Sequence, residues 1–240
     1  MKTTLVVTVL NEIEGMKRIL PHVQKEWVDE ILVLDGGSTD GSLEYAESLG
    51  FPTFRQKSKG LGNAYWEALE ISTGDVIIPF SPDGNSVPER IPELVQKMRE
   101  GYAMAVASRY LDGAKSEDDN FISAFGNWMF TRIINLLFGG HYTDVLVMFR
   151  AWRREIVESL RDTPVGGFET RLSIECAKRK LKVAEIPGDE PKRIGGRTKR
   201  SILICGLVIL RVILKEFFIP RVDSVSKSTD RKTTILTKGD

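Results

Sequence analysis

Short, continuously apolar runs alternate along this chain with segments that have helical spacing. The apolar runs cover residues 4–10, 30–35, 52–56, 75–81, 104–108 and 145–149. Because each run is apolar throughout, rather than at every second residue, we expect strands covered on both faces, as in parallel sheets. The helical segments cover about residues 12–25, 40–49, 62–72, 88–100, 121–138, 152–160 and 168–180. The alternation predicts an α/β fold with a mostly parallel sheet and helices on both faces.

The 240 residues divide into three parts. Residues 1–200 are long enough for one α/β domain with a large core. Residues 201–220 are strongly apolar and predict a helix, and residues 221–240 are polar and predict a disordered tail.

The apolar segment 201–220 is interrupted by Arg211 and again by Lys215 and Glu216. A membrane-spanning helix needs about 20 predominantly apolar residues. We therefore expect this helix to lie on a membrane surface, where its basic residues suit anionic headgroups, or to contact another subunit in a homo-oligomer.

The aromatic-rich segment 121–140 predicts a core helix or, alternatively, a lipid-facing or acceptor groove.

Overall charge and cysteine content exclude several classes of function. The chain has 34 Lys and Arg against 33 Asp and Glu, which gives a net charge of +1. Its overall electrostatic field therefore does not favour binding to nucleic acid. The two cysteines and two histidines provide no ligand set for structural zinc. Both cysteines have apolar neighbours in the sequence, and the N-terminus has no signal-peptide features. These two observations predict a cytosolic location.

Polar residues follow the predicted strands where ligands bind in such folds, at the carboxyl ends. The first run is followed by Leu10, Asn11 and Glu12, and the second ends at Asp35 before two glycines. A carboxylate at this edge can accept hydrogen bonds from a base or ribose. We therefore predict that these four residues contact a nucleotide.

Two segments of the chain are basic and rich in glycine. Lys59 and Gly60 precede a predicted helix, whose open N–H groups suit an anion, although a plain helix start has the same pattern. Arg193, Thr198 and Lys199 belong to the second segment, RIGGRTK, which by its residues alone is compatible with a solvated basic turn before a helix. Arg109 follows a strand, and its guanidinium can bind an anionic acceptor or a donor phosphate in bidentate fashion.

Segments of the chain, taken in order, match the motifs of one enzyme family. They are VTVLNE, ILVLDGGSTDGS, KGLGNAYWEAL, GDVIIPFSPDGNSVPERIPELV, AVASRY, DVLVMFRAWRREIVE, and FETRLSIECAKRKLKVAEIP with RIGGRTK. In this order they resemble the family-two glycosyltransferases, within these the dolichyl-phosphate mannosyltransferase-like branch. The resemblance runs from about residue 4 to 200 and implies a GT-A type, Rossmann-like fold.

The resemblance implies transfer of a sugar from a nucleotide-diphosphate sugar, with inversion and usually with Mg²⁺ or Mn²⁺. A divalent ion stabilises the charge of the leaving diphosphate and needs few oxygen ligands from the protein. Asp83 matches the second aspartate of the family's D-x-D motif and Asn85 the glutamine two residues after that aspartate, so both are predicted metal ligands. Ser81 replaces the first aspartate, and Ser81 and Pro82 are placed beside the donor.

The resemblance also assigns roles near the acceptor. It implies that the segment from Arg193 to Lys199 closes over the diphosphate, and that Asp144 is a general base for an acceptor hydroxyl. A phosphate acceptor needs no such base. Lipid-phosphate transferases have further basic residues after the match to Arg109, whereas residues 111–127 of this chain are acidic, with Lys115 as the single cation.

The sequence therefore predicts a metal-assisted glycosyltransferase, peripheral at the inner face of the cell membrane, acting on a lipid-linked or other glycan-pathway acceptor. One alternative is a nucleotide-sugar-binding relative with impaired catalysis, suggested by Ser81 and by Gly36, which replaces another family aspartate. A second is a nucleotidyltransferase, but such enzymes need a basic, glycine-rich loop directly after the first strand, where LNEIEGMKR instead has two glutamates and one glycine before its lysine and arginine.

Overall fold

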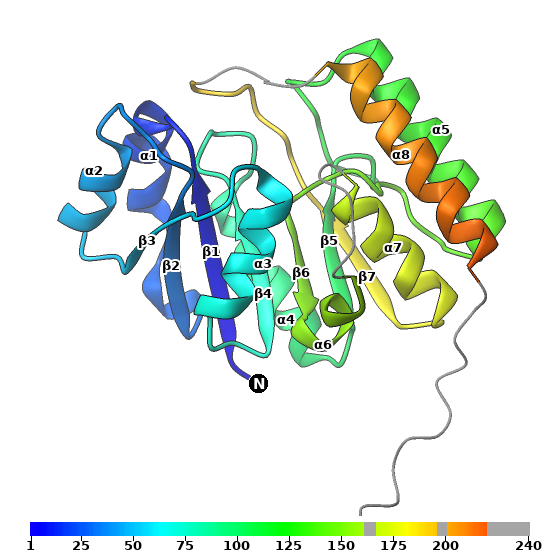
Figure 1. Ribbon diagram of the computed structural model, residues 1–240, viewed down its shortest axis with the longest axis horizontal. Helices are drawn as coiled ribbons and strands as arrows, with labels where there is room; N and C mark the ends of the chain where they lie inside the picture. Colours follow the sequence, from blue (N-terminus) through cyan, green and yellow to red (C-terminus); the bar gives the residue numbers. More distant parts are fainter. Residues whose placement is uncertain (161–166, 196–200, 220–240) are drawn as a thin grey trace, which may run out of the picture.

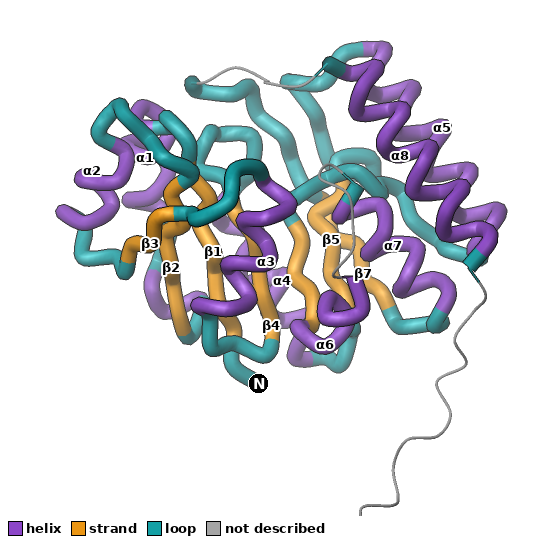
Figure 2. The backbone as a smooth tube through the Cα atoms, in the orientation of Figure 1, coloured by secondary structure: helices purple, strands orange, loops and turns teal. Residues whose placement is uncertain are grey.

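The structure is a computed structural model that describes residues 1–160, 167–195 and 201–219. Within these residues, one sheet has the strand order β3-β2-β1-β4-β6-β5-β7 and is covered by helices on both faces (Figures 1 and 2). Its strands are β1 Thr3–Val9, β2 Glu30–Asp35, β3 Thr53–Arg55, β4 Val76–Phe80, β5 Met104–Ser108, β6 Arg150–Arg153 and β7 Val183–Pro187. Only β6 of these runs antiparallel to its neighbours, which confirms the predicted mostly parallel sheet.

The sheet divides the hydrophobic core into two layers, and helices cover each layer. The helices are α1 Ile13–Ile19, α2 Ser42–Ser48, α3 Leu61–Ile71, α4 Ile91–Arg99, α5 Phe121–Phe138, α6 Arg154–Val157, α7 Phe168–Lys178 and α8 Ile202–Phe218. Helices α1, α2 and α4 pack on one face of the sheet, and α3, α5, α7 and α8 contribute to the core on the other. Because successive strand residues point to opposite faces, β1 contributes Val6 to one layer and Leu5, Val7 and Val9 to the other.

The predicted strand at residues 145–149 is wrong, because these residues form a loop and β6 begins at Arg150. Side chains satisfy the backbone groups of this loop. Asp144 accepts hydrogen bonds from the N–H groups of Leu146 and Val147, and the buried guanidinium of Arg150 donates to the carbonyls of Val145 and Val147. Backbone groups bonded in this way are not available to a sheet ladder.

The structure differs from the sequence prediction in two further respects: it has one strand that was not predicted, and one helix is shorter than predicted. Strand β7, which the apolar runs did not reveal, lies at the edge of the sheet and has alternating exposure, so it lacks a continuous apolar run. Helix α1 ends at Ile19 rather than near residue 25, and a 3₁₀ turn with Pro21 near its start follows. The proline ring fixes φ and removes an N–H donor, which shortens the helix.

Helix α8 lies beside α5, and the two helices run along one side of the molecule (Figure 1). Ile209, Val212 and Ile213 of α8 are buried in the same core layer as α5 and α7. The division of the chain at residue 200 remains a prediction.

Candidate active site

The loops after β1 and β2 are held together by hydrogen bonds, which places their polar residues at one edge of the sheet. The side-chain carbonyl of Asn11 accepts from Thr39 N at 2.8 Å, and Asn11 N donates to Ser38 Oγ at 2.9 Å. Gly36 N donates to Val9 O at 2.8 Å. Leu10 and Asn11 are exposed, and Glu12 is half-buried at the start of α1. The structure thus brings these predicted donor residues next to the Asp35 loop.

Asp35 is fully buried at the end of β2. Its carboxylate accepts hydrogen bonds from Gly37 N and Ser38 N, both at 3.0 Å, and Arg55 Nε lies 3.6 Å from its Oδ2. Much of this carboxylate therefore fixes the loop that carries Ser38. Contact with a base remains a prediction, and Arg55 is an exposed cation that the motifs did not indicate.

Asp83 lies on the loop that leaves β4 and has 4% of its surface exposed. Its Oδ1 accepts a hydrogen bond from Asn85 N at 3.0 Å. Helix α1 supports this loop from behind, since a Cβ at Gly15 would lie 2.2 Å from the carbonyl oxygen of Pro82. A glycine in the segment after β1 therefore helps to set the position of the Asp83 loop, a role that the sequence pattern did not reveal.

The segment that follows β7, residues 188–195, crosses the Asp83 loop and is called the strap below. Ile194 N donates to the carbonyl oxygen of Asp83 at 2.8 Å. Arg193 places Nη2 2.8 Å from Oδ2 of Asp83 and Nη1 3.5 Å from Oε1 of Glu12. Gly84, with φ +91°, leaves room for the Ile194 side chain, which a Cβ would meet at 2.7 Å. Glu12, Asp83 and Arg193, predicted from distant segments, are thus in contact.

Thr198 and Lys199, predicted to continue this basic segment, lie outside the described residues. Lys59 and Gly60 are exposed where α3 begins, and Gly60 has φ +103°. Between the start of α3 and the loop after Asp144 is a hollow of about 230 Å³. It is lined by Leu61, Gly62, Tyr65, Leu146, Met148, Phe168 and Glu169.

The side-chain oxygen atoms of the Asp83 loop fit a divalent ion that also binds a diphosphate. Asp83 contributes one carboxylate, and the buried Oδ1 of Asn85 has no hydrogen-bond partner in the described part of the chain. Ser81 is half-buried and contributes no charge. In the described ranges no group of three or more His, Cys, Asp and Glu residues forms a metal site. Hard cations that bind with nucleotides need only one or two protein ligands, because phosphate and water supply the others.

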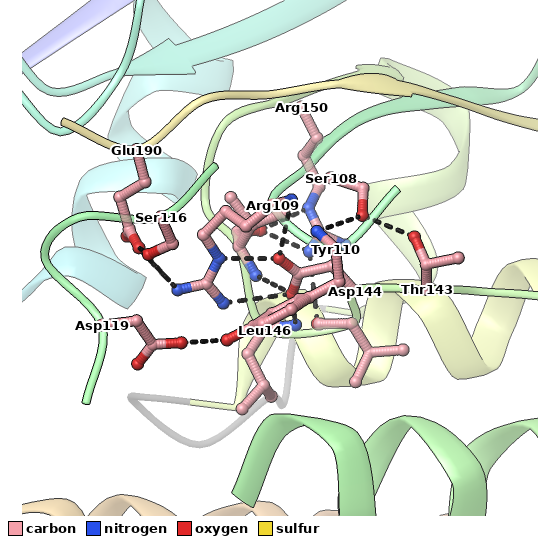
Figure 3. A network of polar contacts seen from close by, with 12 residues as sticks. Ser108, Arg109, Tyr110, Ser116, Asp119, Thr143, Asp144, Leu146, Arg150 and Glu190 are labelled. Carbon is pink, nitrogen blue, oxygen red and sulfur yellow. Dashed lines mark hydrogen bonds and ion pairs between the residues drawn. The ribbon is translucent and has the colours of Figure 1, made fainter. Parts of the chain in front are cut away.

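Arg109 follows β5 and is held by two carboxylates (Figure 3). Its Nε lies 2.7 Å from Oδ2 of Asp144 and its Nη2 lies 3.2 Å from Oδ1, while Nη1 lies 3.2 Å from Oε1 of Glu190 on the strap. Burial opposes the charge of Arg109, but the two carboxylates more than compensate and raise its pKa. The arginine predicted to bind a phosphate is therefore already neutralised within the protein.

Asp144 is fully buried. Burial opposes its ionisation, yet the charge and hydrogen bonds of Arg109 outweigh burial and hold the pKa of Asp144 below its ordinary value. Its oxygens accept from Arg109 and from the N–H groups of Leu146 and Val147. A general base needs an accessible oxygen and a pKa near the working pH. This geometry makes Asp144 a positioning residue for Arg109 and the following loop.

Motif comparison missed Glu190 and Asp118. Glu190 bonds to Arg109 and to Ser116 Oγ, so it fixes the strap to the segment after β5. Asp118 accepts a hydrogen bond from Asn85 Nδ2 at 2.8 Å. Both belong to polar, irregular segments, where hydrophobic periodicity gives no signal. In the sequence, the acidic composition of residues 116–119 was the one sign that this segment could contribute charged side chains to the site.

Comparison with known proteins decides the family. The model of the protein family described as "Glycosyl transferase family 2" matches residues 4–161, about two thirds of the chain. The chain belongs to this family. The resemblance found in the sequence motifs is confirmed, and relatives named as dolichol- or dolichyl-phosphate sugar transferases support the branch.

Several curated proteins named as sugar transferases are similar to this chain. Glycosyltransferase AglJ of Haloferax volcanii is 30% identical over 182 residues, which cover 74% of this chain and 59% of that protein. Dolichol-phosphate mannosyltransferase of Pyrococcus furiosus is 28% identical over 218 residues, which cover 83% of this chain and 59% of that protein. The chain thus spans about 59% of the length of these two relatives. A dolichyl-phosphate hexose transferase of Haloferax volcanii is 26% identical, with 88% of this chain and 92% of that protein covered.

Solved structures with the same architecture confirm the predicted fold class of this family 2 member. Glucosyl-3-phosphoglycerate synthase from Mycobacterium tuberculosis, in complex with Mn²⁺, uridine diphosphate and phosphoglyceric acid, has a TM-score of 0.68. The match covers 93% of this chain and 80% of that chain, at 23% sequence identity. At this identity the likeness is one of fold.

Proposed function

We propose that this protein transfers a sugar, with inversion and with the help of Mg²⁺ or Mn²⁺, from a nucleotide-diphosphate sugar to a lipid-linked or other glycan-pathway acceptor. The observation that carries the proposal is the meeting of Asp83, Glu12 and Arg193 at the carboxyl edge of the sheet. In a family 2 chain this edge is where a nucleotide is expected.

Each residue has a role that follows from its chemistry. Asp83 and Asn85 would hold the divalent ion, which stabilises the negative charge of the leaving diphosphate. Arg193, which pairs with Asp83, can instead donate to phosphate oxygens, because its fork of N–H groups suits either partner. The exposed Lys59 and the N–H groups at the start of α3 provide further positive potential.

We further propose that the protein works at the cytoplasmic surface of a membrane and contacts it with α5 and α8. In the described residues, α5 is one helix that is long and apolar enough to span a membrane by length and composition, and it is only 28% buried. Phe121 and Leu136 of α5 and Leu203 and Phe218 of α8 are each 78% to 85% exposed. Exposed Arg132, Arg211 and Lys215 on the same helices would pair with anionic headgroups.

Binding and donor turnover test the proposed transferase activity. A thermal-shift screen of the full chain over nucleotides and nucleotide sugars, with and without Mn²⁺, should show stabilisation by a nucleoside diphosphate and by its sugar. The stabilising donor should then release nucleoside diphosphate only when the metal is present. Binding without metal-dependent release would favour the impaired relative that Ser81 and Gly36 suggest. Absence of any nucleotide binding would contradict the proposal.

A further inference from the structure

Tyr110 follows Arg109 after β5, and three contacts hold its aromatic ring in place (Figure 3). Its backbone N–H donates to Ser108 Oγ at 3.2 Å, its ring centroid lies 5.3 Å from the guanidinium carbon of Arg109, and its hydroxyl donates to Asp119. Burial and the hydrogen bond to Asp119 raise the pKa of Tyr110, so the side chain stays neutral. A ring that is fixed in this way before a ligand binds loses little conformational entropy on binding.

The ring lies close to the loop that would hold the metal ion. Asp119, which accepts from the Tyr110 hydroxyl, adjoins Asp118, and Asp118 accepts a hydrogen bond from Asn85 Nδ2 at 2.8 Å. The exposed fraction of Tyr110 is 36%. A large aromatic ring that is fixed, partly exposed and next to a binding site offers contact area to a ligand of that site.

Charged groups surround the ring, and they distinguish between two kinds of ligand. Arg109 lies against the ring and Asp119 at its hydroxyl, and the neighbouring Glu117 and Asp118 are exposed. An alkyl chain on the ring would take these groups out of water without giving them hydrogen bonds. A sugar ring has C–H bonds on one face, which suit the negative face of an aromatic ring, and hydroxyl groups at its rim, which can donate to carboxylates. The surroundings of Tyr110 therefore fit a sugar ring better than a lipid chain.

We propose that Tyr110 is a specificity-determining residue that packs against a sugar ring of the acceptor. The inference rests on the proposed function and specifies the substrate class, because the acceptor must already carry at least one sugar. Tyr110 orients this acceptor and takes part in no covalent step. A separate glycosyl transfer, which attaches the first sugar to the lipid or other carrier, must then precede the reaction of this protein.

Saturation-transfer NMR with probes that carry both a sugar and an alkyl chain tests the inference. The full chain, with Mg²⁺ and the nucleoside diphosphate found by thermal shift, is titrated with n-octyl glucoside, n-octyl mannoside or n-octyl galactoside below the concentration at which micelles form. We expect saturation of the sugar-ring protons of at least one probe, and an affinity for it that is about fivefold or more lower in Tyr110→Ala. Saturation of octyl protons alone, of no probe protons, or equal affinity in both proteins would overturn the inference.

Matched variants separate stacking from a structural role. Tyr110→Phe keeps the ring and should retain the wild-type affinity for the probe within about twofold, although it loses the hydrogen bond to Asp119. Phe54→Ala, on the edge strand β3 across the sheet and with the same exposed fraction of 36%, should bind as wild type. Calorimetric titration with the nucleoside diphosphate completes the test. If Tyr110→Ala loses the nucleotide as well as the probe, the role of Tyr110 is structural and the inference fails. If the wild type binds the nucleotide but no probe, only the inference fails, whereas a wild type that binds no nucleotide removes the proposed function itself.

Discussion

The guanidinium of Arg193 lies 2.8 Å from Oδ2 of Asp83, the carboxylate that would hold a divalent ion. A cation from the strap therefore occupies the position next to Asp83 that a metal ion needs. Since a nucleoside diphosphate gives both cations an anionic partner, the nucleotide would relieve this competition. Metal and nucleotide are then expected to bind with positive coupling.

Arg193→Met should bind Mn²⁺ more tightly than the wild type in the absence of nucleotide, because Asp83 loses its competing cation. Arg193 is partly exposed, so the pair contributes up to about 1 kcal/mol, or roughly fivefold in affinity. The same variant should bind uridine or guanosine diphosphate more weakly. Electron paramagnetic resonance of free Mn²⁺ measures the first effect, with Arg193→Lys as the control that keeps the charge. Equal Mn²⁺ affinity in wild type and Arg193→Met would show that the two cations do not compete.

Asp83→Ala should reduce metal-dependent release of nucleoside diphosphate on the order of 100-fold or more, because the ion loses its one charged protein ligand. Asn85→Ala removes a neutral ligand and should have a smaller effect. Steady-state turnover at several Mn²⁺ concentrations distinguishes weaker metal binding from lost catalysis. Glu89→Gln, an exposed carboxylate on the same connection, should behave as wild type. Unchanged turnover in Asp83→Ala would remove the metal assignment.

Gly15→Ala should destabilise the protein and disturb the Asp83 loop, since the added Cβ would lie 2.2 Å from the Pro82 carbonyl oxygen. Such overpacking typically costs about 1 to 3 kcal/mol. Gly126→Ala is the control, because a Cβ there meets nothing within 4 Å and alanine favours a helix. Urea denaturation compares the two variants. If Gly15→Ala is as stable as Gly126→Ala, the packing of α1 on the loop is not tight.

Asp144→Asn should destabilise the protein at neutral pH by about 3 kcal/mol, because Arg109 would lose a buried partner. Since the pKa of Asp144 is lowered in the folded state, its stabilising contribution is present above the unfolded pKa and is lost as pH falls through the folded pKa. The difference between wild type and variant should therefore be constant above about pH 5 and shrink below about pH 4. Urea midpoints from pH 7 to 3 measure it, with the exposed Asp112→Asn as control. A difference that grows on acidification would contradict this account.

Leu203→Glu with Phe218→Glu should release the protein from vesicles that contain anionic lipid. The two changes place negative charge on exposed positions of α8 and leave its buried residues intact. Flotation with phosphatidylglycerol vesicles measures the effect, and the wild type should also dissociate at high salt because the basic residues act electrostatically. If wild type does not float but forms dimers that the variant lacks, α8 contacts a second copy of the chain rather than lipid.

The sequence by itself determined the α/β class and most of the strands, and it predicted Glu12, Asp83 and Arg193 as site residues, which the structure brings together through Arg193. Continuous apolar runs specify strands covered on both faces, and parallel strands place their carboxyl ends at one edge. Those two facts bring Glu12 and Asp83 to one edge without knowledge of the packing, whereas only the family motifs indicated Arg193. The family motifs then gave a chemical role to each.

Only the tertiary structure decided which charges pair with which. Asp144 is a predicted base by position, but Arg109 and two backbone N–H groups occupy its oxygens. The same contacts turn residues 145–149 from an expected strand into a loop. The contacts of Asp118 with Asn85 and of Glu190 with Arg109 join irregular segments that are far apart in the sequence. Ion pairs depend on distances of a few ångströms and on local burial, and neither quantity is encoded in residue type or spacing.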